Sequence, residues 1–121
     1  MNIYRQQLLD HYNNPRNFGA MDDADKTVEL ENQNCGDRIK IYAKLTDGKI
    51  AKLSFDGEGC AIAIASASIL TEHFIGKDLD ELQAFDLSAL QRLLQVELTV
   101  SRLKCANLGL EALKKAAIVV D

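Results

Sequence analysis

The sequence shows no stretch typical of the segments that export a protein or anchor it in a membrane, and we expect none. Its N-terminal stretch, "MNIYRQQLLDHYNN", is amphipathic and polar, without the apolar core of a signal peptide. The longest weakly polar run, 59–70, is too short and too rich in Ala and Ser to span a bilayer. We therefore expect a cytoplasmic protein with no membrane partner, in a compartment that keeps thiols reduced.

Strong positive charge and a closed set of cysteines are also missing. The formal net charge is −4, and Lys and Arg form no cluster beyond Lys114–Lys115, which argues against a nucleic-acid partner. The cysteines number three, and an odd number does not make a closed disulfide framework. Widely spaced cysteines in a small reduced protein favour metal binding or sulfur chemistry.

The remaining composition is that of an ordinary globular protein. The 121 residues are 47% hydrophobic, which is enough to bury one core without disulfides. The sequence contains no internal repeat and no low-complexity tract. We expect a single domain that comprises residues 1–121.

The spacing of apolar residues predicts an α+β fold, with helices at both ends of the chain and a three-stranded sheet between them. Asp47–Gly48 predicts a type I′ hairpin turn, which makes the sheet antiparallel. The helices after the sheet should pack on one of its faces. The expected helices comprise 3–12, 60–75, a short one after 78, 86–94 and one from about 105 onward. The expected strands comprise 27–30, 39–45 and 50–55.

Alternation along the strands predicts which side chains face the core. In the second strand, Ile39 and Ile41 share a face with the apolar residues that follow at every second position. In the third strand, we expect Ala51, Leu53 and Phe55 to share one face.

Each cysteine stands where an anion is favoured. Cys35 lies in a polar turn beside Gly36, Cys60 opens the long apolar helix, and we expect Cys105 to open the last helix. A helix N-terminus carries a partial positive charge, and Lys104 adds a full cation next to Cys105. These features favour the thiolate form of a cysteine.

Thiolates gathered in one place need a cation between them. Cys35, Cys60, Cys105 and the carboxylate of Asp37 together offer three sulfur atoms and one oxygen, a donor set that suits tetrahedral zinc or iron. The wide spacing matches no compact zinc-finger pattern. The cysteines could also be core residues, and Asp37 could be a solvated turn residue, so the residues alone leave both interpretations open.

Four stretches of the chain resemble the motifs of a known family. They are "YRQQLLDHYNNPRNFG", "NCGDRI", "FDGEGCAIAIASASILTEHFIGK" and "RLKCANLGLEALKKA". In order and separation they are similar to the U-type iron–sulfur cluster assembly scaffolds, the family of IscU, SufU and the NifU N-terminal domain. The resemblance runs from Tyr4 to about Lys115.

The resemblance implies a role for each candidate residue. Cys35, Cys60 and Cys105 would accept sulfur and bind a transient [2Fe–2S] cluster, or Zn²⁺ or Fe²⁺, with Asp37 as the ligand that keeps a nascent cluster labile. A cysteine desulfurase would donate sulfur as a persulfide, with Cys35 as the acceptor. Apo iron–sulfur proteins or carrier proteins would receive the product. Such a protein is a scaffold or sulfur acceptor rather than an enzyme with a small substrate.

Within this family, two functions stay open. Lys104–Cys105 is similar to the SufU branch, which implies a zinc-dependent sulfurtransferase in which Lys104 tunes the neighbouring thiolate. The length of the chain, too short for the additional stretch usual in SufU proteins, favours a scaffold. A structural zinc domain is a third interpretation.

Other features of the family pattern bear on partners and on the two histidines. The segment "QVELTVSRLK" lacks the Leu-Pro-Pro-Val-Lys sequence of IscU proteins, which argues against a chaperone partner. We expect His11 and His73 to be packing or surface residues.

Overall fold

The computed structural model describes residues 3–33 and 36–117. Within these residues the chain forms an α+β fold of one antiparallel sheet with helices, as predicted. Its elements are α1 (Ile3–Asn13), β1 (Lys26–Asn32), β2 (Asp37–Thr46), β3 (Lys49–Glu58), α2 (Ala61–Phe74), α3 (Leu79–Ala84), α4 (Leu87–Leu94) and α5 (Val100–Ala116).

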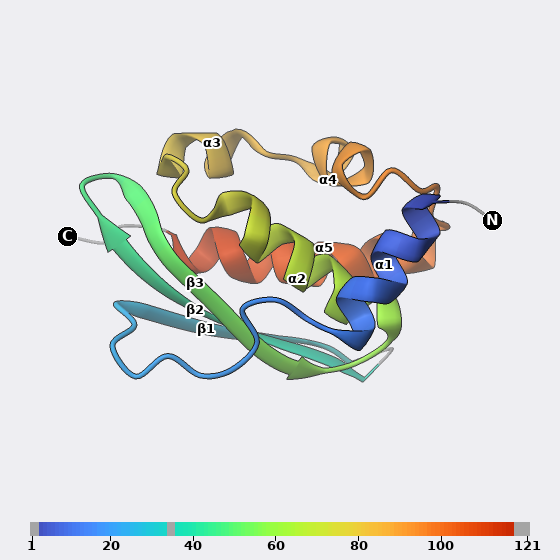
Figure 1. The fold of residues 1–121 in the computed structure, drawn as a ribbon, viewed down its shortest axis with the longest axis horizontal. Coiled ribbons are helices and arrows are strands. Elements are labelled where there is room, and N and C mark those ends of the chain that lie inside the picture. The colour runs from blue at the N-terminus through green and yellow to red at the C-terminus, as the bar shows by residue number, and fades with distance from the viewer. Residues whose placement is uncertain (1–2, 34–35, 118–121) are drawn as a thin grey trace.

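The elements are arranged in layers. The strands lie in the order β1-β2-β3, and both neighbouring pairs are antiparallel. Helices α2 and α5 lie against one face of the sheet, α3 and α4 lie beyond them, and α1 packs on α2 (Figure 1). None of the helices among the described residues is long and apolar enough to cross a membrane.

The turn between β2 and β3 has the predicted geometry. Asp47 and Gly48 have φ values of 52° and 76°, and Thr46 pairs with Lys49 on either side of them. Positive φ at both central residues is the mark of a type I′ turn. The local signal in the sequence was therefore sufficient to predict this hairpin.

The prediction for the buried face of β3 is wrong at Ala51. Leu45 pairs with Ile50, whereas Lys44 pairs with Lys52, so Ala51 is an extra residue in the ladder. This β-bulge reverses the alternation on one side of it. Ile50 is therefore fully buried and Ala51 is exposed.

The prediction that α5 begins near Cys105 is also wrong. The helix begins at Val100, and the N-cap residue is Thr99, whose side chain accepts a hydrogen bond from the backbone N–H of Arg102. Cys105 thus lies in the second turn of α5 and is buried. The partial positive charge of a helix N-terminus falls off within the first turn, so it does not act on Cys105 as expected.

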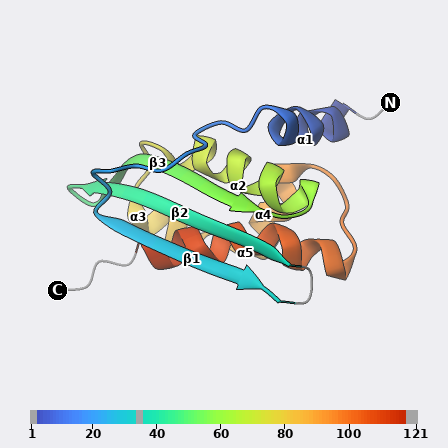
Figure 2. The ribbon, with the colours of Figure 1, turned by 90° about the horizontal axis from the view of Figure 1, so that it is seen from below.

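One end of the molecule gathers segments that are distant in the sequence. The end of β1, the start of β2, the end of β3 and the first turns of α2 and α5 lie together there (Figure 2). The candidate site residues of the described chain belong to these segments.

Candidate metal and sulfur site

Asp37 is a buried carboxylate at the first position of β2. Only 1% of its surface is exposed, and it pairs with Asn32 at the end of β1. Its Oδ1 accepts a hydrogen bond of 2.9 Å from the backbone N–H of Cys60, and its Oδ2 lies 3.8 Å from the Sγ of Cys60. Asp37 is therefore held at the site and does not extend into solvent.

Cys60 stands at the N-terminus of α2, as predicted. It is the N-cap residue, with φ −69° and ψ 166°, and its sulfur makes no capping hydrogen bond. The side chain is half-buried. The sulfur thus lies near the positive end of a long helix, where an anion is stabilised.

Cys105 completes a group of three donors. Three donor atoms lie within 4.8 Å of one another: the Sγ of Cys60, the Sγ of Cys105 and one carboxylate oxygen of Asp37. Asp37 lies in β2, Cys60 directly before α2, and Cys105 in α5. Folding therefore brings together side chains that are far apart in the sequence.

The chemistry of these donors fits a cation. Among the described residues, Asp37 forms no ion pair with Lys, Arg or His. A buried carboxylate is costly unless it is paired or binds a metal. Two sulfur atoms and one oxygen supply three of the four positions of a tetrahedral zinc or iron site.

The fourth expected ligand, Cys35, lies outside the described residues. In sequence it belongs to the connection between β1 and β2, directly before Gly36 and Asp37. Gly36 has a φ of 73° and donates a backbone hydrogen bond of 2.8 Å to the carbonyl of Asn32. The role of Cys35 stays a prediction.

An open pocket of about 360 Å³ leads to the donors. Besides Asp37, Cys60 and Cys105, it is lined by Gly59, Ser101 and Arg102. Sequence reasoning missed these last three residues. Ser101 and Arg102 precede Cys105 by four and three positions, so they share its helix face, a spacing that would have identified them once the true start of α5 was known.

Lys104, the proposed tuning residue, has a different position. It is exposed and is not part of the lining of this pocket. Helical geometry directs adjacent residues to different faces, so Lys104 and Cys105 lie on different faces of α5. Its effect on the neighbouring thiol stays an untested expectation.

Comparison with known proteins places the chain in one family. A family model described as the NifU-like N-terminal domain matches residues 3–119. The chain belongs to the NifU-like N-terminal domain family. The N-terminal part of a NifU-like protein from Brucella abortus has the same fold, with a TM-score of 0.83 at 21% identity; the match covers 94% of this chain and 91% of that one.

Two curated relatives of this NifU-like chain carry different functional names. The zinc-dependent sulfurtransferase SufU of Bacillus subtilis (strain 168) is 38% identical, over 93% of this chain and 88% of SufU. The iron–sulfur cluster assembly scaffold protein IscU of Escherichia coli (strain K12) is also 38% identical, over 93% of this chain and 90% of IscU.

The two alignments differ in length. The alignment with SufU extends over 130 residues and the alignment with IscU over 117, although each includes 93% of this chain. SufU thus has more residues without a counterpart in this NifU-like chain than IscU has. Identity does not separate the two relatives.

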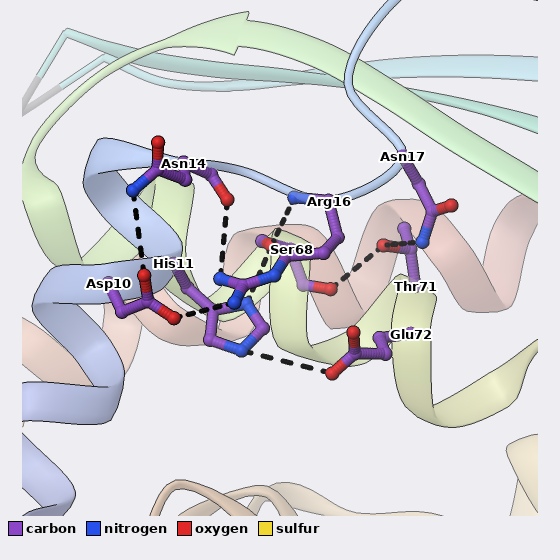
Figure 3. A network of polar contacts seen from close by, with 8 residues as sticks. All are labelled: Asp10, His11, Asn14, Arg16, Asn17, Ser68, Thr71 and Glu72. Atoms are coloured by element: carbon purple, nitrogen blue, oxygen red, sulfur yellow. Dashed lines mark hydrogen bonds and ion pairs between the residues drawn. The ribbon is translucent and has the colours of Figure 1, made fainter.

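A polar network fastens the first helix of this NifU-like chain to α2 (Figure 3). The Nδ1 of His11 lies 2.7 Å from the Oγ of Ser68, which also accepts the backbone N–H of Arg16 at 2.9 Å. The Nε2 of His11 lies 3.9 Å from Glu72. Asn17 donates a hydrogen bond to Thr71 in the next turn of α2.

Burial and packing define the role of both histidines. His11 is 4% exposed, and burial, followed by the positive charge of Arg16, lowers its pKa. Burial also lowers the pKa of His73, whose ring packs against Phe74 and Phe85. Both are packing residues, and neither belongs to the group of donors among the described residues that could hold a metal ion.

Proposed function

We propose that this chain is an iron–sulfur cluster assembly scaffold. It receives sulfur from a cysteine desulfurase and assembles a transient [2Fe–2S] cluster on Cys35, Cys60 and Cys105 with Asp37. The observation that carries the proposal is the convergence of Asp37, Cys60 and Cys105, whose donor atoms lie within 4.8 Å of one another. The membership of the family and the relative named IscU support it.

The mixed donor set suits a cluster that must leave. Thiolates are soft ligands that bind iron–sulfur clusters, whereas a carboxylate is a harder ligand and a poorer match for this cargo. An oxygen ligand in place of a fourth thiolate therefore weakens one bond to the cluster. The pocket beside the donors is open, which gives a recipient protein access to the cargo.

Sulfur would arrive by thiol–disulfide exchange. The thiolate of Cys35 attacks the outer sulfur of the desulfurase persulfide, the sulfur–sulfur bond of the donor breaks, and the desulfurase thiolate leaves. The product is a persulfide on Cys35. Its sulfur becomes sulfide after it takes up two electrons from an external thiol or electron carrier.

The proposal includes its cellular setting. The whole chain, 1–121, acts as one scaffold domain in the cytoplasm. Its partners are a cysteine desulfurase as donor and apo iron–sulfur proteins or carrier proteins as recipients.

Mapping of the accepted sulfur tests this proposal. The protein is incubated anaerobically with a desulfurase and cysteine, alkylated, digested and analysed by mass spectrometry. We expect one added sulfur atom on the peptide that contains Cys35, and none on that peptide in Cys35→Ser. Labelling at the wild-type level in Cys35→Ser would identify a different acceptor, and no transfer to any cysteine would contradict sulfur acceptance altogether.

A second candidate function is zinc-dependent sulfur transfer. It is favoured by the 38% identity to SufU and by the Lys104–Cys105 pair. In this function, zinc held by Asp37 and the cysteines would keep the thiolates deprotonated and ready for exchange. The two candidates differ in what the protein retains: a scaffold gains iron and sulfide together, whereas a sulfurtransferase keeps zinc and carries only persulfide.

A further inference from the structure

Gly59 lies directly against the carboxylate of Asp37. A Cβ atom added to Gly59 would lie 2.5 Å from Oδ1, 3.0 Å from Cγ and 3.1 Å from Cβ of Asp37. Non-bonded carbon atoms are in favourable contact at about 3.5–4.0 Å. A side chain at position 59 and the present position of the carboxylate therefore exclude each other.

The backbone of Gly59 does not itself require glycine. Gly59 has no positive φ, so its conformation is open to other residues. Gly57 provides the contrast, because a Cβ atom there would meet the backbone oxygen of Arg38 at 2.1 Å. Gly57 thus serves the packing of β3 on β2, whereas the contacts of Gly59 are with the side chain of a candidate ligand.

Asp37 has little freedom to move away from a side chain at position 59. It is 1% exposed and lies at the first paired position of β2. Its Oδ1 accepts a hydrogen bond from the backbone N–H of Cys60, and its Oδ2 lies 3.8 Å from the sulfur of Cys60. A shift of the carboxylate would break the first contact and change the distance of the second.

We infer that Gly59 is a positioning residue for the metal site, which sets the place of the Asp37 carboxylate relative to Cys60 and Cys105. The inference rests on the proposed metal site. The absence of a side chain at position 59 leaves room for the carboxylate beside the two sulfur atoms, where all three donors face one centre. Any larger residue would displace the oxygen ligand from its place beside the sulfur ligands.

The test is a double-mutant cycle with Co²⁺, whose visible absorption changes with the number and kind of its ligands. Metal-free wild type, Gly59→Ala, Asp37→Ala and the double variant are titrated with Co²⁺. We expect Gly59→Ala to weaken binding about 10- to 100-fold, the range for groups that orient metal ligands. Its spectrum should approach that of Asp37→Ala. On the Asp37→Ala background, Gly59→Ala should have almost no effect. A change in affinity of up to about twofold lies within the usual margin of a double-mutant cycle.

Two controls separate positioning from general damage. Gly109→Ala makes the same substitution where the nearest atoms are 3.4 Å away, and it should keep the wild-type spectrum and affinity. Thermal unfolding of the metal-free proteins should show a lower Tm for Gly59→Ala than for wild type. Most of that loss should disappear when Asp37→Ala removes the opposing carboxylate.

Several results would overturn the inference. They are a wild-type spectrum and affinity in Gly59→Ala, an equal loss with and without Asp37, or no Co²⁺ binding by the wild type. The proposed function fails separately. A wild-type protein that binds Co²⁺ through Asp37 but accepts no sulfur from a desulfurase would contradict the function and support the positioning role.

Discussion

Asp37 is a carboxylate almost completely removed from water, beside the sulfur atoms of two cysteines. Its hydrogen bond from the N–H of Cys60 fixes its orientation, yet the described residues provide it with no ion pair. A group in this position is retained at a cost in stability, because an ionised carboxylate loses its hydration on burial. A bound cation would offset that cost.

Replacement of this carboxylate should change the lifetime of a cluster. In Asp37→Ala we expect a reconstituted cluster to decay several times more slowly than in wild type, because the labile oxygen ligand is gone. The measurement is the loss of visible absorbance after a chelator is added. The control is Asp56→Ala, which removes a carboxylate that accepts a hydrogen bond from Tyr42. The cluster in this variant should decay at the wild-type rate. An unchanged lifetime in Asp37→Ala would show that Asp37 is not a ligand.

His11 predicts a pH dependence of folding. Because burial lowers its pKa in the folded state, the unfolded chain binds the proton more readily. Its contribution to stability is therefore complete above the unfolded pKa of about 6.5 and is lost as the pH falls below that value. We expect His11→Gln to make the free energy of unfolding less dependent on pH below about 6.5.

Urea unfolding across this pH range checks the prediction for His11. His73→Gln is the comparison, because burial also lowers the pKa of His73 and its variant should flatten the same range in part. An equal loss of stability on acidification in wild type and His11→Gln would contradict the assignment of His11 as a neutral packing residue.

At the scale of elements, the contact between α2 and α5 holds two of the donors in place. Cys60 precedes α2 and Cys105 lies within α5, so the distance between these helices sets the distance between the sulfur atoms. Gly109 of α5 faces Ala67 of α2, and a Cβ atom at position 109 would lie 3.4 Å from the Cα and Cβ of Ala67. The small residues allow the two helices to approach closely.

This contact yields a pair of opposite predictions. Gly109→Ala fits the available space and should stabilise the fold by roughly 0.5–1 kcal/mol, because Ala favours a helix interior. Gly109→Leu should destabilise it by about 1–3 kcal/mol and weaken Zn²⁺ binding, because overpacking moves the helices apart. Chemical unfolding and zinc titration check both variants. Wild-type zinc affinity in a folded Gly109→Leu protein would contradict the link between helix distance and the site.

Elements with local signals were predictable from the sequence, and elements set by packing were not. Asp47–Gly48 determined its turn by its own backbone preferences, and the apolar run after Cys60 identified α2. The bulge at Ala51 has no local signal of this kind, because it follows from the register of β3 against β2. The start of α5 was missed because Thr99, its cap, lies in a segment without clear periodicity.

The same distinction applies to the candidate site. The sequence predicted Asp37, Cys60 and Cys105, and the structure brings the three together. The sequence did not predict that Gly59 is a neighbour of Asp37 or that Arg102 lines the pocket. Both contacts depend on where elements distant in the sequence meet.

At the scale of the whole molecule, the site joins segments that the chain must bring together over long separations. A metal ion bound by β2, α2 and α5 would be absent from the unfolded chain, so its binding energy adds to the stability of the fold. With a metal bound, the site would be a cross-link between the sheet and its two covering helices. Loss of any one ligand should weaken this cross-link without changing the hydrophobic core.

We therefore expect Zn²⁺ to raise the Tm of the metal-free protein. At a free concentration about a hundredfold above its Kd, a ligand adds about 2.7 kcal/mol, which is on the order of 10 °C for a chain of this size. Cys60→Ser should lose most of this increase, and Lys104→Ala, which alters an exposed residue, should retain it. A zinc-dependent increase in Cys60→Ser equal to that of wild type would place the metal elsewhere.

The measurement that tests the central claim most directly is an anaerobic reconstitution. Metal-free protein is mixed with ferrous iron, cysteine, a thiol reductant and a catalytic amount of desulfurase, and the visible spectrum, iron and acid-labile sulfide are measured. The scaffold function predicts a [2Fe–2S] chromophore with near-equal iron and sulfide, which is lost in Cys60→Ser. A metal-free protein that forms no chromophore and carries only persulfide on Cys35, together with tightly bound zinc in the untreated protein, would contradict it and identify a sulfurtransferase.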